Sequence, residues 1–553
     1  MRIMGIPGYF VDLLKRNRKV LQLLQEAKKV DVLCVDANGI IYEVVRHLEQ
    51  KEHKSAENNQ IRNRDRLGAL SPEAAALRIA PLVTNELARL PELMSVTDEY
   101  FVAFDGIAPN AKIAQQRQRR YGRLIQNKAM REVRGGSVIS LSSAQPHSTP
   151  LAIHVPPFDT TQITPATPFM TALMPLLKEQ LTHAIRLKFR FSGSDEPGEG
   201  EHKIMKLCRQ GIWQEKDVVV HGLDADLILL ALANQHQCGS LRLAREAPSF
   251  IKHLDKTMDP HATYILDIPR FAKVINRAMG GAATENLAST DYVFMMSMLG
   301  NDFMPHQPAI SIRDNGIERV CRAYKACRGA DSHFTLLAGE PLVPHWRNVG
   351  TLLKYLGEQE DQVMSKFAKR RAGFAHQASF PPTQPSGAKP NDLEAIWNQL
   401  PQLQIGLENF IAAGTTGWRE RYYQHMLGDM VNVTPVDDGS EHITSPWLEV
   451  NTERWLQGLQ WVWEYYTSND ANWHWVYAGS HPPPLLQELA RLGRFDDGDD
   501  KLCKWRETSE PMTNAEQLAR VLPPCDVDGN WILPSVELHW QYCRHGWEAE
   551  LLA

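Results

Sequence analysis

Three short apolar stretches, each with an aspartate at the point where its apolar run ends, place the strongest constraint on the fold of this sequence. They are "DVLCVDANGII" (31–41), "EYFVAFDGIAP" (99–109) and "VVVHGLDADLILLAL" (218–232). All three are rich in β-branched and aromatic residues, as β-strands are. Residues 71–94, between the first two, begin with Ser-Pro-Glu and have the pattern of a helix. This alternation predicts an α/β fold with a mainly parallel central sheet and surrounding helices.

The aspartates at these strand ends form the first candidate site. They are Asp36, Asp105 and the pair Asp224 and Asp226. Ligands of open parallel sheets bind beyond the carboxyl ends of the strands. One aspartate before a turn is ordinary turn chemistry, but three strands that each supply one favour a shared cluster. The pair points to one side if its segment is extended and diverges if it is helical.

A fourth segment, "SGSDEPGEGEHKIMKL" (192–207), crowds four acids into seven positions and breaks them with proline and glycine. Helix capping is one interpretation, because acids in and before a first turn favour the positive end of the helix dipole. A metal site is the other. Glu199 and Glu201 would not face together inside a helix, but they can converge around Gly200 at a helix start. Asp302, in "SMLGNDFMPH", closes a further apolar segment.

Acids that converge from five places in the sequence need cations, because like charges a few ångströms apart raise each other's pKa. Oxygen ligands without cysteine suit Mg²⁺ or Mn²⁺. Two such ions about 4 Å apart are the usual device for phosphodiester cleavage. We therefore expect a centre for two Mg²⁺ ions, with Mn²⁺ as a substitute. Its predicted ligands and catalytic residues are Asp36, Asp105, Glu199, Glu201, Asp224, Asp226 and Asp302.

A basic segment, "AKIAQQRQRRYGRLIQNKAMREVR" (111–134), directly follows the Asp105 turn and carries eight basic residues against one acid. A solvated helix surface is the ordinary interpretation of such a segment. Here, however, neighbouring acids that would pair with the basic residues are missing, which favours phosphate binding. The formal net charge of −5 limits such binding to a local patch. On a helix one face is shared by Lys112, Gln116, Arg119, Arg120 and Arg123.

Composition places few other constraints on the chain. No apolar run approaches the ~18 residues that span a bilayer, and the N-terminus lacks the unbroken apolar stretch of a signal peptide. The eight cysteines are scattered without a CxxC pair, which indicates neither a zinc knuckle nor a disulfide framework. We expect an intracellular protein without a membrane partner. The sequence does not distinguish cytoplasm from nucleus and identifies no protein partner.

These residues, in this order, resemble the Xrn family of 5′→3′ exoribonucleases. The resemblance runs through "MGIPGYF", "FVAFDGIAPNAKIAQQRQRRY", "FDTTQITPATPFM", "FSGSDEPGEGEHKIM", "HGLDADLILLAL" and "DYVFMMSMLGNDFMPH", and it resumes at 455–484. It implies a sheet of the 5′-nuclease (PIN-like) type and degradation of single-stranded RNA with a 5′-monophosphate, which releases mononucleotides. It also implies that the seven acids form the two-metal site.

The resemblance gives further roles to individual positions. It implies that Lys112, Gln116, Arg119 and Arg120 form a pocket for the 5′-monophosphate. It also implies an aromatic pair that sandwiches the leading bases. This chain has Tyr42 where the family usually has histidine, which preserves stacking, and Trp473 and Trp475 are the candidates for the second ring.

Two other functions are compatible with parts of this sequence. A flap-type 5′ nuclease acting on DNA shares the acidic core, but "FMPHQPAISIRDNGIERV", which follows Asp302, lacks the glycine pattern of its helix-hairpin-helix. The second alternative is a non-catalytic RNA-binding relative of these nucleases. The presence of all seven acids argues against it.

At 553 residues, the chain is long enough for several domains. Residues 135–168 are rich in Gly, Ser, Thr and Pro and are typical of a long loop, and 372–391 are typical of a linker. From about residue 392 the pattern becomes mostly helical and rich in tryptophan. We expect an exonuclease domain at 1–330, a variable helical segment and linker at 331–391, and a helical domain at 392–553.

Overall fold

The computed structural model of the chain describes most of both halves. The described residues are 9, 21–23, 30–57, 63–113, 115–117, 120, 158–222, 224, 226–246, 259, 262–280, 285–377, 410–427, 432–435, 441–477, 483–493, 495 and 509–522. Within them, no helix combines the length and the apolar character needed to cross a membrane.

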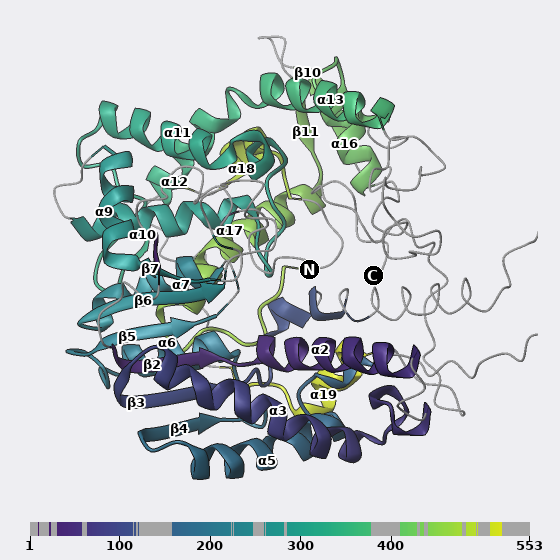
Figure 1. Ribbon diagram of the computed structural model, residues 1–553. Coiled ribbons are helices and arrows are strands. Elements are labelled where there is room, and N and C mark those ends of the chain that lie inside the picture. Colours follow the sequence, from purple (N-terminus) through teal and green to yellow (C-terminus); the bar gives the residue numbers. More distant parts are fainter. Residues whose placement is uncertain are drawn as a thin grey trace, which may run out of the picture.

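A seven-stranded sheet forms the centre of the first half (Figure 1). Its strand order is β1-β7-β6-β5-β2-β3-β4. Strands β2 to β6 are parallel to one another, and β7 and β1 complete one edge with antiparallel pairings. The mainly parallel α/β sheet predicted from the sequence is confirmed. The strands are β1 (Leu21–Leu23), β2 (Val30–Asp36), β3 (Val96–Ala103), β4 (Lys188–Ser192), β5 (Asp217–His221), β6 (Ser240–Glu246) and β7 (Thr263–Asp267).

The order of the strands reverses at β2. The chain adds β3 and β4 on one side of β2 and later adds β5 and β6 on its other side. In the register, Asp36 pairs with Ala103 of β3, and Val35 pairs with His221 of β5. The carboxyl ends of three strands therefore lie side by side at the switch in strand order, which is where open α/β sheets bind ligands.

Alternating residues of each central strand enter two different cores. Val32 and Cys34 of β2 pack on one face of the sheet, and Leu33 and Val35 pack on the other. The second of these faces is covered by α2 (Asn38–Glu57), α3 (Pro72–Leu93) and α5 (Pro168–Ala184). The first is covered by α6 (Gly200–Arg209), α7 (Asp226–Asn234) and α9 (Ile268–Ala278), and α10 (Glu285–Met296) packs on α7 and α9.

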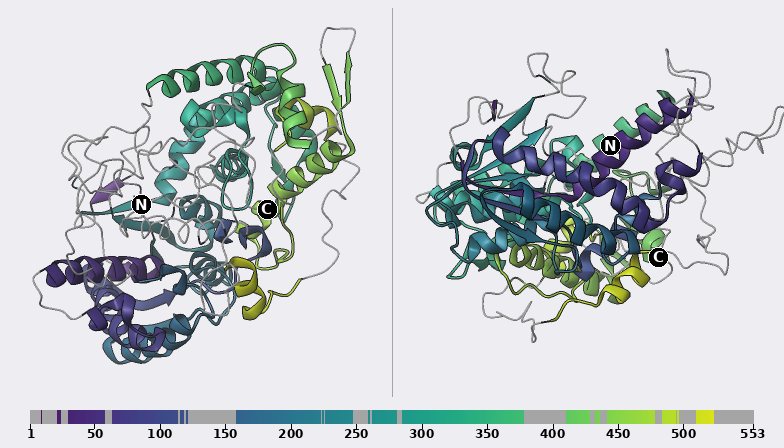
Figure 2. Two further views of the ribbon diagram at one scale, coloured as in Figure 1. Left: turned by 90° about the vertical axis from the view of Figure 1, so that its right-hand side faces the viewer. Right: turned by 60° about the horizontal axis from the view of Figure 1, so that its bottom comes forward.

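The hydrophobic core beneath α6 and α7 continues without a break into the helical second half of the chain, because Val32 and Trp461 belong to one cluster. Figure 2 shows this half stacked beside the sheet. It comprises α11 (Gly316–Ala330), α12 (Trp346–Gly357), α13 (Glu360–Gln377), α16 (Trp418–Leu427), α17 (Pro446–Thr467), α18 (Leu486–Leu492) and α19 (Asn514–Val521), with two short hairpins, β8 (Leu337–Ala338) with β9 (Val343–Pro344) and β10 (Asn432–Pro435) with β11 (Glu441–Thr444).

The elements agree with the sequence predictions at some places and differ from them at others. The predicted helix at 71–94 is α3, with Ser71 as its N-cap. The apolar run 218–232 is a strand only as far as His221 and then becomes helix α7. The predicted linker begins too early, because α13 continues through 372–377, and the rest of that linker lies outside the described residues. Most of the predicted loop at 135–168 also lies outside the described residues. Its last residues, 158–168, include a 3₁₀ turn and the start of α5.

A buried charge cluster holds the helical half together. Arg419 of α16 forms ion pairs with Glu360 of α13 at 2.9 Å and with Glu488 of α18 at 3.2 Å. Glu360 also accepts hydrogen bonds from the backbone N–H groups of Leu486 and Gln487 at the start of α18. All three charged side chains are buried. One guanidinium thus links three helices.

We expect Arg419→Met to lower the free energy of unfolding by about 3–5 kcal/mol, because it leaves two buried carboxylates without their cation. Denaturant unfolding followed by circular dichroism measures the change. The matched control is Arg322→Met, which removes an exposed pair with Glu318 and should cost less than about 1 kcal/mol. Equal effects of the two substitutions would contradict this role of the cluster.

Candidate active site

The carboxyl ends of β2 and β3 place the first two predicted acids next to each other. Asp36 is the last residue of β2, and Asp105 lies two residues beyond β3. Asn38 fixes Asp105 from both sides: its Nδ2 donates to Asp105 Oδ2 at 2.7 Å, and its Oδ1 accepts from the Asp105 backbone N–H at 3.2 Å. The side chain of Asp105 is therefore held in one orientation toward the sheet edge.

The glycines of "EPGEGE" allow the turn before α6 to approach these acids closely. Gly198 has a φ of +105°, a conformation that favours glycine. The N–H of Gly200 donates to Asp105 Oδ1 at 2.8 Å, and a Cβ at Gly200 would lie only 2.6 Å from Asp36 Oδ1. Lys203 ties the turn down, since its Nζ donates to the carbonyl oxygens of Phe104 and Gly193 at 2.8 and 2.7 Å.

Helix capping does not explain the acids of this turn. Glu199 is the N-cap of α6, but its side chain makes no capping hydrogen bond. Glu199 and Glu201 are buried, and Glu201 lies with Asp224 and Asp226 in a group whose carboxylate oxygens are within 4.8 Å of one another. Asp226 is the first residue of α7, so the pair converges at a helix start rather than along a strand.

Lys112 joins the last predicted acid to this group. Its Nζ donates to Glu199 Oε1 and lies 3.1 Å from Asp302 Oδ2. Burial by itself lowers the pKa of Lys112, but the charges of Glu199 and Asp302 outweigh it and raise that pKa well above its usual value. Lys112 is therefore a buried ammonium group in direct contact with two carboxylates. All seven predicted acids thus lie in one cluster, linked by contacts and mutual electrostatic repulsion: Asp36, Asp105, Glu199, Glu201, Asp224, Asp226 and Asp302.

The donor atoms of the cluster fit a hard divalent cation. Burial, followed by repulsion from neighbouring carboxylates, raises the pKa of Asp36, Glu201 and Asp226 well above the usual range. One oxygen of each of these three side chains is buried and accepts no hydrogen bond within the described part of the chain. Crowded carboxylate oxygens of this kind are the ligands that Mg²⁺ and Mn²⁺ prefer.

His202 lies beside the cluster as a buried imidazole. Its pKa is well below the usual value because of burial and, secondarily, the charges of Arg209 and Lys112. One of its ring nitrogens is within 4.8 Å of oxygens of Glu199 and Glu201. The ring stacks on Tyr465 with a centroid distance of 3.7 Å.

The basic segment begins as predicted beside the acids. Residues 110–113 and 115–117 are helical, and Gln116 is buried in the same segment as Lys112. Arg120 Nε donates to Thr164 Oγ1 at 2.8 Å, while Arg119 lies outside the described residues. Helix α19 contacts this segment, because Arg117 Nε donates to the backbone carbonyl of Arg520 at 2.8 Å, and Gln517 Oε1 accepts from the backbone N–H of Ala108, just before the segment, at 2.8 Å.

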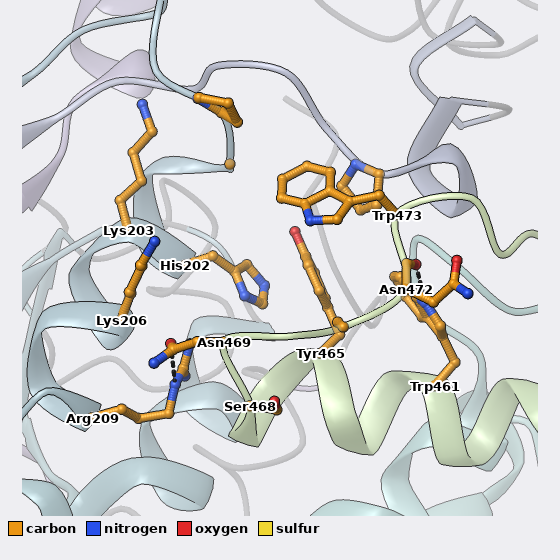
Figure 3. A pocket seen from close by; sticks show the side chains of 14 residues that line it. His202, Lys203, Lys206, Arg209, Trp461, Tyr465, Ser468, Asn469, Asn472 and Trp473 are labelled. Atoms are coloured by element: carbon orange, nitrogen blue, oxygen red, sulfur yellow. Dashed lines mark hydrogen bonds between the residues drawn. The ribbon is translucent and has the colours of Figure 1, made fainter. Parts of the chain in front are cut away.

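The predicted aromatic residues differ in how far their rings are exposed. Tyr42 lies on α2 with 44% of its surface exposed. Trp473 is half-buried and lines a pocket with Pro109 and Tyr465 (Figure 3), and its backbone carbonyl accepts from the Asn110 N–H at 2.9 Å. Trp475 is buried and stacks on Trp461 at 5.1 Å. Of the two tryptophans, Trp473 is the one that presents its ring to a cavity.

Tyr465 is a site residue that sequence reasoning missed. Its hydroxyl group donates a hydrogen bond to Glu199 Oε2 at 3.0 Å, although 266 positions separate the two residues. It is buried in α17, a helix crowded with aromatic side chains whose default use is in a core. No local pattern distinguishes this tyrosine from its neighbours.

Comparisons with known proteins match both halves of the chain. The family model described as "XRN 5'-3' exonuclease N-terminus" matches residues 4–246, and the one described as "Xrn1 helical domain" matches residues 285–386 and 402–534. Together they include six of the seven acids in the first match and Asp302, Tyr465 and Trp473 in the second.

Individual relatives agree with the family models. A protein of Cryptococcus neoformans named "5'-3' exoribonuclease 2" is 30% identical over 385 residues, which cover 58% of this chain and 33% of the relative. "5'-3' exoribonuclease 1" of Homo sapiens is 22% identical over 594 residues, 97% of this chain and 31% of the relative. The chain spans about a third of the length of these relatives. It belongs to the XRN 5′→3′ exonuclease family.

Proposed function

We propose that this chain is a 5′→3′ exoribonuclease that hydrolyses single-stranded RNA carrying a 5′-monophosphate and releases mononucleotides. The observation that carries the proposal is the convergence of seven carboxylates at the switch point of the sheet, next to the buried ammonium of Lys112. The relatives bear the name 5'-3' exoribonuclease, which supports the direction and the substrate. RNA degradation, including that of messenger RNA, is the corresponding cellular role.

The cofactor that fits this donor set is a pair of Mg²⁺ ions, for which Mn²⁺ would substitute. The seven acids would hold them, and the buried oxygens of Asp36, Glu201 and Asp226 that have no protein donor among the described residues support this assignment. Bound ions of this kind supply Lewis acidity and an activated water for phosphodiester hydrolysis.

The residues of the chain itself would bind and align the RNA end. Lys112 and Arg120 carry cationic donors for a terminal phosphate, and charge-assisted bonds of this type are strong and directional. Gln116 and Arg119 complete the proposed pocket. Because Lys112 also contacts Glu199 and Asp302, a phosphate held by it would lie beside the acids. Only the 5′ end would then align a scissile bond with the cluster.

Tyr42 and Trp473 are the proposed stacking residues. A base–aromatic stack contributes about 1–3 kcal/mol, so Trp473→Ala should weaken RNA binding roughly 5- to 150-fold with little sequence preference. Fluorescence anisotropy with a 5′-phosphorylated oligonucleotide in Ca²⁺ measures the affinity. Trp475→Ala is the comparison: it should act on thermal stability, because the ring is buried against Trp461. Unchanged affinity in Trp473→Ala would contradict the stacking role.

The proposed function is tested with a 5′-phosphorylated RNA labelled at its 3′ end. In Mg²⁺ we expect mononucleotides from the start of the reaction, with the 3′ label kept in shortening chains. Cleavage of DNA flaps at the junction in preference to RNA would instead identify a flap nuclease. Tight binding of RNA without hydrolysis in Mg²⁺ or Mn²⁺ would identify a non-catalytic relative.

A further inference from the structure

The hydrogen bond between Tyr465 and Glu199 connects the helical half of the chain to the acidic cluster. We infer that Tyr465 is a positioning residue, which fixes the carboxylate of Glu199 for metal binding, so that α17 completes the centre built by the sheet. This inference rests on the proposed function, since it requires that the cluster binds divalent cations.

Both oxygens of Glu199 are held by separate donors. Oε1 accepts from Lys112 Nζ, and Oε2 accepts from the hydroxyl group of Tyr465 at 3.0 Å. Glu199 is only 5% exposed, so its carboxylate has little access to solvent. Two donors from different segments fix the plane of the carboxylate, which a single donor would leave free to rotate.

The ring of Tyr465 is itself held on several sides. It stacks on His202 at 3.7 Å and on Trp461 at 4.8 Å, with interplanar angles of 29° and 16°. The edge of Phe303, the residue after Asp302, packs against it at 5.3 Å. Figure 3 shows Tyr465 rising from α17 with its hydroxyl oxygen directed away from the helix. The hydroxyl group is therefore preorganised by packing.

This arrangement has a specific chemical consequence. Glu199 lies between one cation, Lys112, and two further carboxylates of the cluster, Asp105 and Asp302. The hydroxyl group of Tyr465 bonds only Oε2, so it orients the carboxylate while leaving lone pairs of both oxygens available to a cation. Removal of a donor that orients a metal ligand in this way typically lowers metal affinity or activity 10- to 100-fold.

The test compares two variants that each remove one buried tyrosine hydroxyl group. Tyr465→Phe keeps the ring and its stacking. The control, Tyr324→Phe, removes a hydroxyl group that donates to Asp291 at 2.7 Å, a buried carboxylate outside the seven-acid cluster. The full chain is titrated with Mn²⁺ in the absence of RNA, and free Mn²⁺ is followed by electron paramagnetic resonance. RNA hydrolysis is then measured over a range of Mg²⁺ concentrations.

We expect Tyr465→Phe to raise the Kd for Mn²⁺ about 10- to 100-fold and to raise the half-saturating Mg²⁺ concentration in parallel. High Mg²⁺ should restore kcat, and KM for RNA should stay unchanged. Tyr324→Phe should leave Mn²⁺ affinity as in the wild type while losing a similar amount of thermal stability.

Wild-type Mn²⁺ affinity in Tyr465→Phe would overturn the inference, whether or not activity falls, because the hydroxyl group would then act elsewhere or only in folding. That result leaves the metal centre intact. A wild-type protein that binds no Mn²⁺ at all would overturn the metal centre as well, and the two failures are therefore distinguishable.

Discussion

Asp226→Asn should reduce RNA hydrolysis by about three orders of magnitude or more. The substitution removes one negative charge from a group in which the carboxylate oxygens of Glu201, Asp224 and Asp226 lie within 4.8 Å of one another. Loss of a ligand that holds a catalytic cation removes several kcal/mol of transition-state stabilisation, and each 1.36 kcal/mol corresponds to about tenfold in rate. Single-turnover hydrolysis of 5′-phosphorylated RNA in saturating Mg²⁺ measures the effect.

The same substitution should have the opposite effect on stability without metal. The pKa of Asp226 is raised by burial and then by repulsion from Asp302 and Asp224, so its ionised form is disfavoured in the folded protein. Asp226→Asn should therefore melt at a higher temperature than the wild type in EDTA, and Mg²⁺ should stabilise it less. Asp98→Asn, at the amino end of β3 in an exposed pair with Lys216, should change neither property.

Near-normal hydrolysis in Asp226→Asn would rule out this residue as a ligand. A lower melting temperature in EDTA would show that Asp226 stabilises the fold rather than straining it.

The second large effect is expected from the double substitution Arg119→Ala and Arg120→Ala. Hydrogen bonds to charged groups contribute about 1.5–3 kcal/mol each. Loss of two should therefore lower the preference for a 5′-monophosphate over a 5′-hydroxyl about 100-fold or more. Mn²⁺ binding should be unaffected, because the double substitution leaves all seven acids in place. Competition between the two RNA ends in one reaction measures the preference.

Arg117→Ala is the matched control for this pair. Arg117 belongs to the same basic segment of the sequence, but its Nε donates to the backbone carbonyl of Arg520 in α19, so it should not change end selection. If the double variant still selects the monophosphate end, the basic segment is only a solvated surface.

Much of this site could be predicted from the sequence because its geometry follows from strand order. An aspartate at the end of a buried strand faces its counterparts whenever the strands are parallel neighbours, and β2, β3 and β5 are. The close turn at the start of α6 could likewise be predicted from the local sequence, because Gly198 and Gly200 alternate with the acids there. Gly200 is required by its approach to Asp36.

The other features of the fold and the site could not be predicted, because they depend on tertiary contacts that no local sequence pattern encodes. The run 218–232 is buried throughout both its strand and its helix, and periodicity cannot separate the two when every face is apolar. Trp473 and Trp475 are two positions apart in the same sequence motif, yet tertiary packing buries only Trp475. Tyr465 acquires its partner across 266 positions. The expected domain limits, at residues 330 and 391, remain a prediction.

The most direct test compares one RNA sequence with four 5′ ends: hydroxyl, monophosphate, triphosphate and cap. A terminal monophosphate carries nearly two negative charges near neutral pH, whereas a triphosphate or cap adds bulk that a pocket for one phosphate should exclude. We predict rapid, Mg²⁺-dependent release of mononucleotides from the monophosphate RNA alone and no cleavage of a circular form of the same RNA. Equal rates on all four ends, or efficient cleavage of the circle, would contradict a 5′-monophosphate-directed exonuclease.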